Sequence, residues 1–380
     1  MNIALVLPDF EPYEAASGAL AIIVRQLALE LPQHAQGATV VGPAPSATWE
    51  HGTAARLVPA VPRLRRVLDR AAGRVRSGSG PAARYRRAVA ERVAGCDRLV
   101  VMNDLDLAAS LRRSTGTATW CFAQNEIEPH ESTDEDVRRL DGLLACSPYI
   151  RHWLMERYRV DDAFVAVVPN GVDLELFGPA EVGPDDRDAD QVTGADDASP
   201  PIGGVFVGRI DPNKGILELL EATTRVRRDG VGFALTVAGP IAPWGLTPDE
   251  ATSFAPKFEA AVSLAGATYL GSITREATAS LMAGADVVFV PSVSQEPFGL
   301  TAVEALASGV AVVLSDRGAL PWIGGDAALI VEPRSDALAG AIAELAGDPT
   351  RRSDLAARAR DRAREFTWTR SAAALVVALT

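Results

Sequence analysis

The chain has 380 residues, of which 48 % are hydrophobic and 23 % are charged, and its formal net charge is −12. This length favours two domains, the composition is that of a globular protein, and the acidic balance argues against a nucleic-acid partner. No apolar run approaches the roughly 20 residues that span a bilayer. The first residues lack the basic region of a signal peptide, and the three cysteines are widely spaced, so we expect a cytoplasmic protein with reduced thiols.

Short apolar runs alternate with helical patterns, which predicts parallel sheets covered by helices on both faces. The strands expected in the first half are NIALVL, ATVVG, RLVVM, TATWCFA and GLLACS. Those expected in the second half are IGGVFVG, FALTVAG, ATYLG, DVVFVPS, VAVVLSD and AALIVE. With a hinge near Val160–Pro169, this predicts two Rossmann-like α/β domains, residues 1–165 and 166–365, and a helix over 366–380. Ligands of such domains bind at the carboxyl ends of the strands, in a cleft between the domains.

The charges are unevenly distributed along the chain. Eleven arginines and two acids lie within Arg56–Arg92, whereas seven acids and one arginine lie within Glu181–Asp197. The acidic run lacks apolar periodicity and is typical of a surface loop. The arginine-rich segment has three open interpretations: a solvated helix pair, a peripheral contact with an anionic membrane, or a binding site for a phosphorylated acceptor.

A turn with two cations follows the first expected strand of the second half, in VFVGRIDPNKGILELLEA. Arg209 directly follows the strand, and Lys214 precedes a helix that begins near Gly215. Only two of the 37 basic residues are lysines, Lys214 and Lys257, so a lysine in this turn is informative. Because a helix N-terminus favours an anion, the two cations predict a diphosphate clamp. Two solvated turn cations are the alternative.

Two carboxylates bracket another helix start, in PSVSQEPFGLTAVEALASGVAVVLS. Glu296 lies just ahead of the expected N-terminus and Glu304 just past its first turn. The backbone N–H groups expected to be free for a ligand there belong to Phe298, Gly299, Leu300 and Thr301. Two acids around an anion-binding helix end suit a ligand with hydroxyls at both ends and an anion in the middle. A nucleotide sugar has that layout.

These motifs resemble one known family. GRIDPNKG, with Glu296 and Glu304 at E-x7-E spacing, closely resembles the donor site of family 4 retaining glycosyltransferases, and VVPNGVDLELF and RGALPWIGGDAALIVEP belong to the same pattern. The similarity covers most of residues 140–370. It implies a GT-B fold, with two Rossmann-like domains around a cleft, no catalytic metal and no cofactor. It also implies that the C-terminal helix crosses back to the first domain.

The resemblance assigns roles to individual residues. Arg209 and Lys214 would hold the donor diphosphate. Glu304 would hold the ribose hydroxyls, and Glu296 would face the transferred sugar. The anomeric configuration would be retained, with the leaving phosphate assisting the incoming nucleophile.

The resemblance is weaker in the first half. A glycine-rich turn of the family lies against the donor phosphates, and Gly18 has a similar position, although a plain helix start is the alternative. Many relatives carry a histidine directly after the strand TATWCFA, near the reacting sugar. Here that position falls on Gln124 or Asn125, and His130 follows further along. An amide can bond to a sugar hydroxyl but cannot act as a general base.

Several acids follow the expected strands of the first half: Asp9, Glu11, Glu14, Asp104, Asp106, Glu126, Glu128 and Glu131. If their loops line the acceptor half of the cleft, they suit a cationic or polyhydroxylated acceptor, such as an amino sugar or aminocyclitol. Ordinary loop acids are the alternative.

The sequence thus predicts a glycosyltransferase that moves a hexosyl unit from a nucleotide sugar to a small polar acceptor with a hydroxyl group. UDP is the favoured nucleotide, with GDP and ADP as alternatives, and no oligomeric state is predicted. Three other functions stay open: cell-envelope lipid or polysaccharide assembly at a membrane surface, epimerisation of a UDP-sugar, and catalytically silent binding of a sugar nucleotide. No G-x-G-x-x-G follows the first strand of either domain, which sets aside a nicotinamide dehydrogenase.

Overall fold

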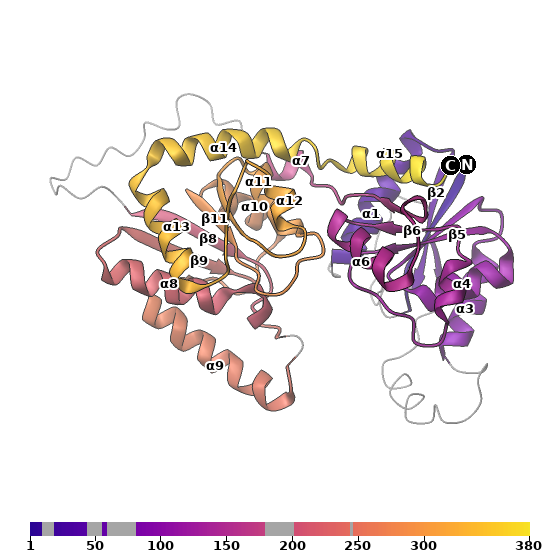
Figure 1. Ribbon diagram of the computed structural model, residues 1–380, viewed down its shortest axis with the longest axis horizontal. Coiled ribbons are helices and arrows are strands. Elements are labelled where there is room, and N and C mark those ends of the chain that lie inside the picture. Colours follow the sequence, from indigo (N-terminus) through magenta and orange to yellow (C-terminus); the bar gives the residue numbers. More distant parts are fainter. Residues whose placement is uncertain (10–18, 44–54, 59–80, 179–200, 244–245) are drawn as a thin grey trace. The chain divides into compact units, whose positions relative to one another are not determined.

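The computed structural model describes residues 1–9, 19–43, 55–58, 81–178, 201–243 and 246–380. The chain divides into two compact units (Figure 1), one of Met1–Gly171 with Trp368–Thr380 and one of Val172–Thr367. Several positions discussed above lie outside the described residues: Glu11, Glu14, Gly18, the arginines from Arg63 to Arg76, and the acidic run 181–197.

The first unit is built on a seven-stranded parallel sheet in the order β3-β2-β1-β4-β5-β6-β7. Its strands are β1 (Asn2–Val6), β2 (Gly37–Pro43), β3 (Ala55–Val58), β4 (Arg98–Met102), β5 (Ala118–Ala123), β6 (Gly142–Ala145) and β7 (Val165–Val167). Four successive residues of β1 are buried, as expected for a strand covered on both faces. The two units divide after Gly171, two residues beyond the expected hinge near Val160–Pro169, because β7 lies within that range and pairs with β6.

The helices of the first unit are α1 (Ala19–Glu30), η1 (Leu31–Gln33), α3 (Pro81–Arg92), α4 (Leu105–Thr115), α5 (Asp134–Arg138), α6 (Pro148–Tyr158), η2 (Asp162–Phe164) and α15 (Trp368–Ala378). Side-chain caps begin several of them; for example, the Asp104 carboxylate accepts the Leu107 N–H at 2.8 Å at the start of α4. The C-terminal helix α15 packs against α1, where the Thr369 hydroxyl donates to Glu30 at 2.8 Å. The last helix is therefore part of the first unit, although the residues just before it belong to the second.

The second unit holds a six-stranded parallel sheet in the order β10-β9-β8-β11-β12-β13. The strands are β8 (Ile202–Val207), β9 (Phe233–Ala238), β10 (Thr268–Tyr269), β11 (Val287–Val290), β12 (Ala311–Ser315) and β13 (Leu329–Val331). The helices are α7 (Leu174–Phe177), η3 (Pro212–Lys214), α8 (Ile216–Arg228), α9 (Pro248–Ala265), α10 (Arg275–Ala283), α11 (Leu300–Ala307), α12 (Leu320–Gly324), α13 (Ser335–Gly347) and α14 (Pro349–Ala363).

The core of the second unit fixes the sheet against its helices. The rings of Phe233 and Phe289 meet edge to face, 5.9 Å apart, in a cluster that includes buried residues of α8 and α13. A Cβ on Gly204 would come within 2.3 Å of the Phe233 ring. The position of this ring therefore requires a glycine at residue 204 of β8. The strand order reverses between β8 and β11, and ligands of doubly wound sheets bind at such a switch point.

Within the part of the chain that the structure describes, no helix has the length and apolar character needed to cross a membrane.

Candidate active site

A cavity of about 90 Å³ lies at the switch point of the second sheet, beyond the carboxyl ends of β8 and β11. Its lining includes Gly208, Arg209, Lys214, Glu296, Leu300 and Thr301. Three separate segments therefore meet at this cavity: the turn after β8, the loop after β11, and the N-terminus of α11. The residues singled out in GRIDPNKG and EPFGLT lie together around it.

Lys214 and Glu296 form an ion pair at this cavity. The Lys214 Nζ lies 2.7 Å from Glu296 Oε2, and the Ser292 hydroxyl donates to the same oxygen at 2.8 Å. The carboxylate is largely buried, with 12 % of its side chain exposed, and the ammonium group is partly accessible at 29 %. One cation and one carboxylate, 82 residues apart in sequence, are thus presented to the same space.

Asp211 orients Arg209. The Nε and Nη2 atoms of Arg209 both lie 2.7 Å from Asp211 Oδ2, and the other oxygen of Asp211 accepts the Asn213 N–H at 2.8 Å. Asp211 is completely buried, whereas the Arg209 side chain is 42 % exposed. A buried carboxylate thus fixes a guanidinium that remains accessible. Sequence reasoning missed Asp211, although an aspartate just before Pro212 is a common cap of a short helix.

We expect Asp211→Asn to lower the free energy of unfolding by about 1–3 kcal/mol, because the substitution removes the charge that pairs with Arg209 inside the protein. The amide can still accept the Asn213 N–H, so the turn itself should form. Urea denaturation measures the loss, and Asp229→Asn, at the exposed end of α8, is the matched control. A loss no larger than that of the control would contradict the buried pairing.

The N-terminus of α11 points its backbone donors to the cavity. Gly299 precedes the helix with a φ of +100°, and the N–H groups of Ala302 and Val303 are the first to bond back, both to the Gly299 carbonyl. The N–H groups of Leu300 and Thr301 come before this ladder, so they are available to a ligand. Phe298 is buried, and its ring packs edge to face on Trp322 and Phe366.

Glu304 lies one turn further along α11 and does not line the small cavity. Its Oε1 atom is 3.0 Å from Nη1 of Arg275, and 12 % of its side chain is exposed. Burial raises the pKa of Glu304 to about 7, although the charge and hydrogen bond of Arg275 act to lower it. The carboxyl group therefore titrates near neutral pH.

Gln124 directly follows β5, and its side chain is buried in the first unit. Its N–H donates to Asn103 Oδ1 at 2.6 Å, and its Oε1 accepts from Asn170 Nδ2 at 2.7 Å. The remaining amide atoms of this pair, Gln124 Nε2 and Asn170 Oδ1, are buried without a hydrogen-bond partner in the described chain. Asn125 and His130 are exposed instead, so Gln124 alone among the three candidates offers a buried, unsatisfied polar atom.

The acids of the first unit have local partners. Glu128 pairs with Arg157 at 3.0 Å, and Glu131 pairs with Arg86 at 2.7 Å. Glu126 accepts a hydrogen bond from the Tyr149 hydroxyl, and Asp104 caps α4. Asp106 accepts the backbone N–H groups of His130, Glu131 and Ser132. These contacts account for five of the eight acids without a ligand, and these five do not favour a cationic acceptor.

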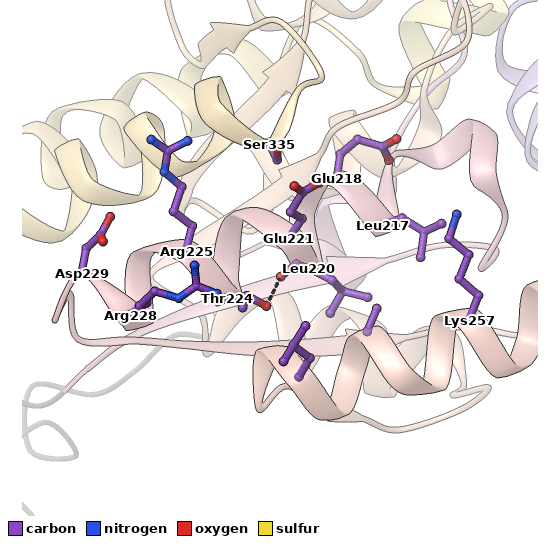
Figure 2. Close-up of a pocket in the computed structure, with 12 residues that line it drawn as sticks. Leu217, Glu218, Leu220, Glu221, Thr224, Arg225, Arg228, Asp229, Lys257 and Ser335 are labelled. Atoms are coloured by element: carbon purple, nitrogen blue, oxygen red, sulfur yellow. Dashed lines mark hydrogen bonds between the residues drawn. The ribbon is translucent and has the colours of Figure 1, made fainter.

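A larger hollow lies elsewhere in the second unit. A groove of about 770 Å³ runs between α8 and α9 and reaches the start of α13 (Figure 2). Arg225 and Arg228 flank one end and Lys257 the other, with Glu218 and Glu221 between them. The charges are spread along the groove rather than directed to one point, and none of the predicted site residues is present. We therefore do not assign the site to this groove.

Across the described ranges, no cluster of three or more histidine, cysteine or acidic side chains is arranged to hold a metal ion.

Part of the chain is similar in sequence to known proteins. Residues 199–362 match a family model described as Glycosyl transferases group 1. A similar curated protein is the D-inositol 3-phosphate glycosyltransferase of Rhodococcus erythropolis, 34 % identical over 247 residues, which are 63 % of this chain and 53 % of the relative. The matched part of this chain spans about half the length of the curated relatives.

Solved structures resemble the whole chain. One is a glycosyltransferase from Rickettsia africae, with a TM-score of 0.76 and 15 % identity, covering 99 % of this chain and 97 % of that one. Another is HepE from Anabaena in complex with UDP and glucose, with a TM-score of 0.72 and 17 % identity, covering 98 % of each chain. At these identities the similarity establishes the fold, two Rossmann-like α/β domains of the GT-B type.

Proposed function

We propose that this chain, whose residues 199–362 match the Glycosyl transferases group 1 model, is a glycosyltransferase that transfers a hexosyl unit from a nucleotide sugar to a hydroxyl group. The observation that carries the proposal is the ion pair of Lys214 and Glu296, 2.7 Å apart, in the cavity that Arg209 and the α11 N-terminus also line. Such a site offers positive charge to a diphosphate and a carboxylate to the hydroxyls beside it.

The chemistry needs this arrangement because charge moves during the reaction. The bond between the sugar C1 and the diphosphate oxygen breaks, a bond from C1 to the acceptor oxygen forms, and the acceptor hydroxyl gives up its proton. Negative charge grows on the leaving diphosphate, where Arg209, Lys214 and the α11 N–H groups stabilise the transition state more than the ground state. Since the Gln124 amide cannot accept the proton, we assign that role to the leaving phosphate.

Finer features of the proposal follow the family 4 pattern. Glu296 binds hydroxyls of the transferred sugar, Glu304 binds the ribose, the configuration at C1 is retained, and no metal ion or cofactor takes part. We favour a UDP-sugar donor, because the similar structure of HepE contains UDP and glucose. A small hydroxyl-bearing acceptor agrees with the name of the Rhodococcus relative. We propose a cytoplasmic location, in which the thiols of the three cysteines stay reduced.

A donor screen tests the proposal. We expect one of UDP-, GDP- and ADP-glucose to raise the melting temperature of the wild type but not that of Lys214→Ala, because a ligand at 100 times its Kd stabilises a protein by about 2.7 kcal/mol. The nucleotide sugar that binds is then incubated with candidate acceptors, with and without EDTA. Binding without any hydrolysis or transfer would reject the transferase and favour a silent sugar-nucleotide-binding protein. No stabilisation by any of them would reject the donor site.

A further inference from the structure

Arg275 holds Glu304 from a neighbouring helix. Arg275 is the first residue of α10, which the Thr274 side chain caps by accepting the Ala277 N–H at 3.2 Å. Its Nη1 atom lies 3.0 Å from Glu304 Oε1, and its Cζ atom lies 5.1 Å from the centre of the Phe177 ring on α7. Since α7 packs against both α10 and α11, the guanidinium is fixed by an aromatic face as well as by the carboxylate.

The other charged groups near α11 face elsewhere. Glu175 on α7 and Glu276 on α10 are exposed. Asp173 caps α7 by accepting backbone N–H groups, and Arg360 on α14 donates to the carbonyl of Gly309, beyond the far end of α11. In the described part of the chain, Arg275 is therefore the charge that opposes the effect of burial on the pKa of Glu304.

We infer that Arg275 is a positioning residue for donor binding, which keeps the Glu304 carboxylate ionised and oriented so that it can accept the hydroxyls of the nucleotide ribose. The inference rests on the proposed function. An ionised carboxylate has two oxygens that accept hydrogen bonds, whereas a protonated one gives up part of that capacity. Because Arg275 binds Oε1, this contact fixes the orientation of the Glu304 carboxylate. It therefore also sets the direction in which the other oxygen and the remaining lone pairs accept hydrogen bonds.

The pH dependence of binding separates this role from a merely structural one. In the wild type, affinity should fall as the pH decreases through about 7, because Glu304 takes up a proton there. Without Arg275 the pKa of Glu304 rises further, so the midpoint moves to higher pH. The proper probe is the nucleotide sugar that binds best in the donor screen, because its diphosphate is esterified at both ends and does not titrate near neutrality.

We would measure Kd by calorimetry between about pH 6 and pH 8. Near pH 7, Arg275→Ala should weaken binding about tenfold, the loss expected for a hydrogen bond to a charged group. Arg275→Lys keeps the positive charge and should restore most of the midpoint, and Glu304→Gln should abolish the pH dependence. Arg228→Ala, in the distant groove of Figure 2, is the matched control and should leave affinity and midpoint unchanged.

Each outcome decides the inference. An upward shift of the midpoint in Arg275→Ala, reversed in Arg275→Lys, supports it. If the wild type binds a nucleotide sugar and Arg275→Ala has the same midpoint, the inference is overturned while the proposed function stands. If the wild type binds none, both fall. Should Arg275→Ala fail to fold, Arg275→Gln, which keeps most of the side chain's volume, replaces it under the same criteria.

Discussion

We expect Lys214→Ala to lower the rate of glycosyl transfer about 10²–10³-fold, the loss typical of removing one group that stabilises developing charge. Lys214 lines the same cavity as the N-terminus of α11, where the leaving diphosphate is expected. Its interaction with the diphosphate strengthens as the glycosyl bond breaks, so most of the loss falls on kcat rather than on KM. Steady-state kinetics with the donor from the screen measure both.

The chain offers a matched control for the loss of a lysine charge. Lys257 is the only other lysine, and it lies on α9 in the separate groove of Figure 2, outside the lining of the candidate site. Lys257→Ala removes the same charge from the same unit and should leave kcat unchanged. Equal losses in the two variants would mean that Lys214 acts through net charge alone. In the double variant Lys214→Ala/Glu296→Gln, the losses should be smaller than additive, because the two groups share one site.

The main strands of both sheets were predictable because each is a run of apolar residues that is buried on both faces. All residues of β11 and β12 are buried, and all of them except Ser315 are Val, Phe, Ala or Leu. The edge strands of the first sheet were not predicted. β3 has four residues beside an arginine-rich stretch, and β7 has three residues next to VPNG, where turn signals dominate. Neither is long enough for its own pattern to outweigh that of its neighbours.

The convergence of the site residues followed from one rule, that side chains after neighbouring parallel strands meet at one edge of the sheet. Arg209 follows β8 and Glu296 follows β11, and these strands pair. The residues that orient them were not predictable in this way. Asp211 lies two residues from Arg209, but its role depends on its complete burial, which the sequence does not show. Arg275 meets Glu304 only because α10 and α11 both pack on α7.

The acids of the first unit show the opposite case. They follow strands as the rule requires, yet arginines on helices α3 and α6 pair with two of them. A sequence pattern gives the strand that precedes a residue but not the helix side chain that comes to face it. For this reason the prediction of a cationic acceptor had no support from the contacts of Glu128 and Glu131.

Gly215→Ala should strongly destabilise the protein. Gly215 joins η3 to α8 with a φ of +70°, and a Cβ there would lie 1.9 Å from the carbonyl oxygen of Pro291, just after β11. A backbone carbonyl cannot rotate away as a side chain can, so the turn and the loop after β11 must separate. We expect a loss on the order of 3–4 kcal/mol in the free energy of unfolding, measured by urea denaturation.

The matched control is Gly230→Ala, because Gly230 has a similar φ of +83° but nothing within 4 Å of the added Cβ. It reports only the strain of a left-handed alanine, roughly 1–2 kcal/mol. The difference between the two variants therefore measures the close approach of the turn to the loop. The N–H groups of Val293 and Ser294 reach the Asn213 carbonyl across the same contact, so separation should also move Lys214 away from Glu296 and weaken nucleotide binding. Equal losses in the two variants would show that the turn does not pack against the loop, and the ion pair of Lys214 and Glu296 would lose its structural basis.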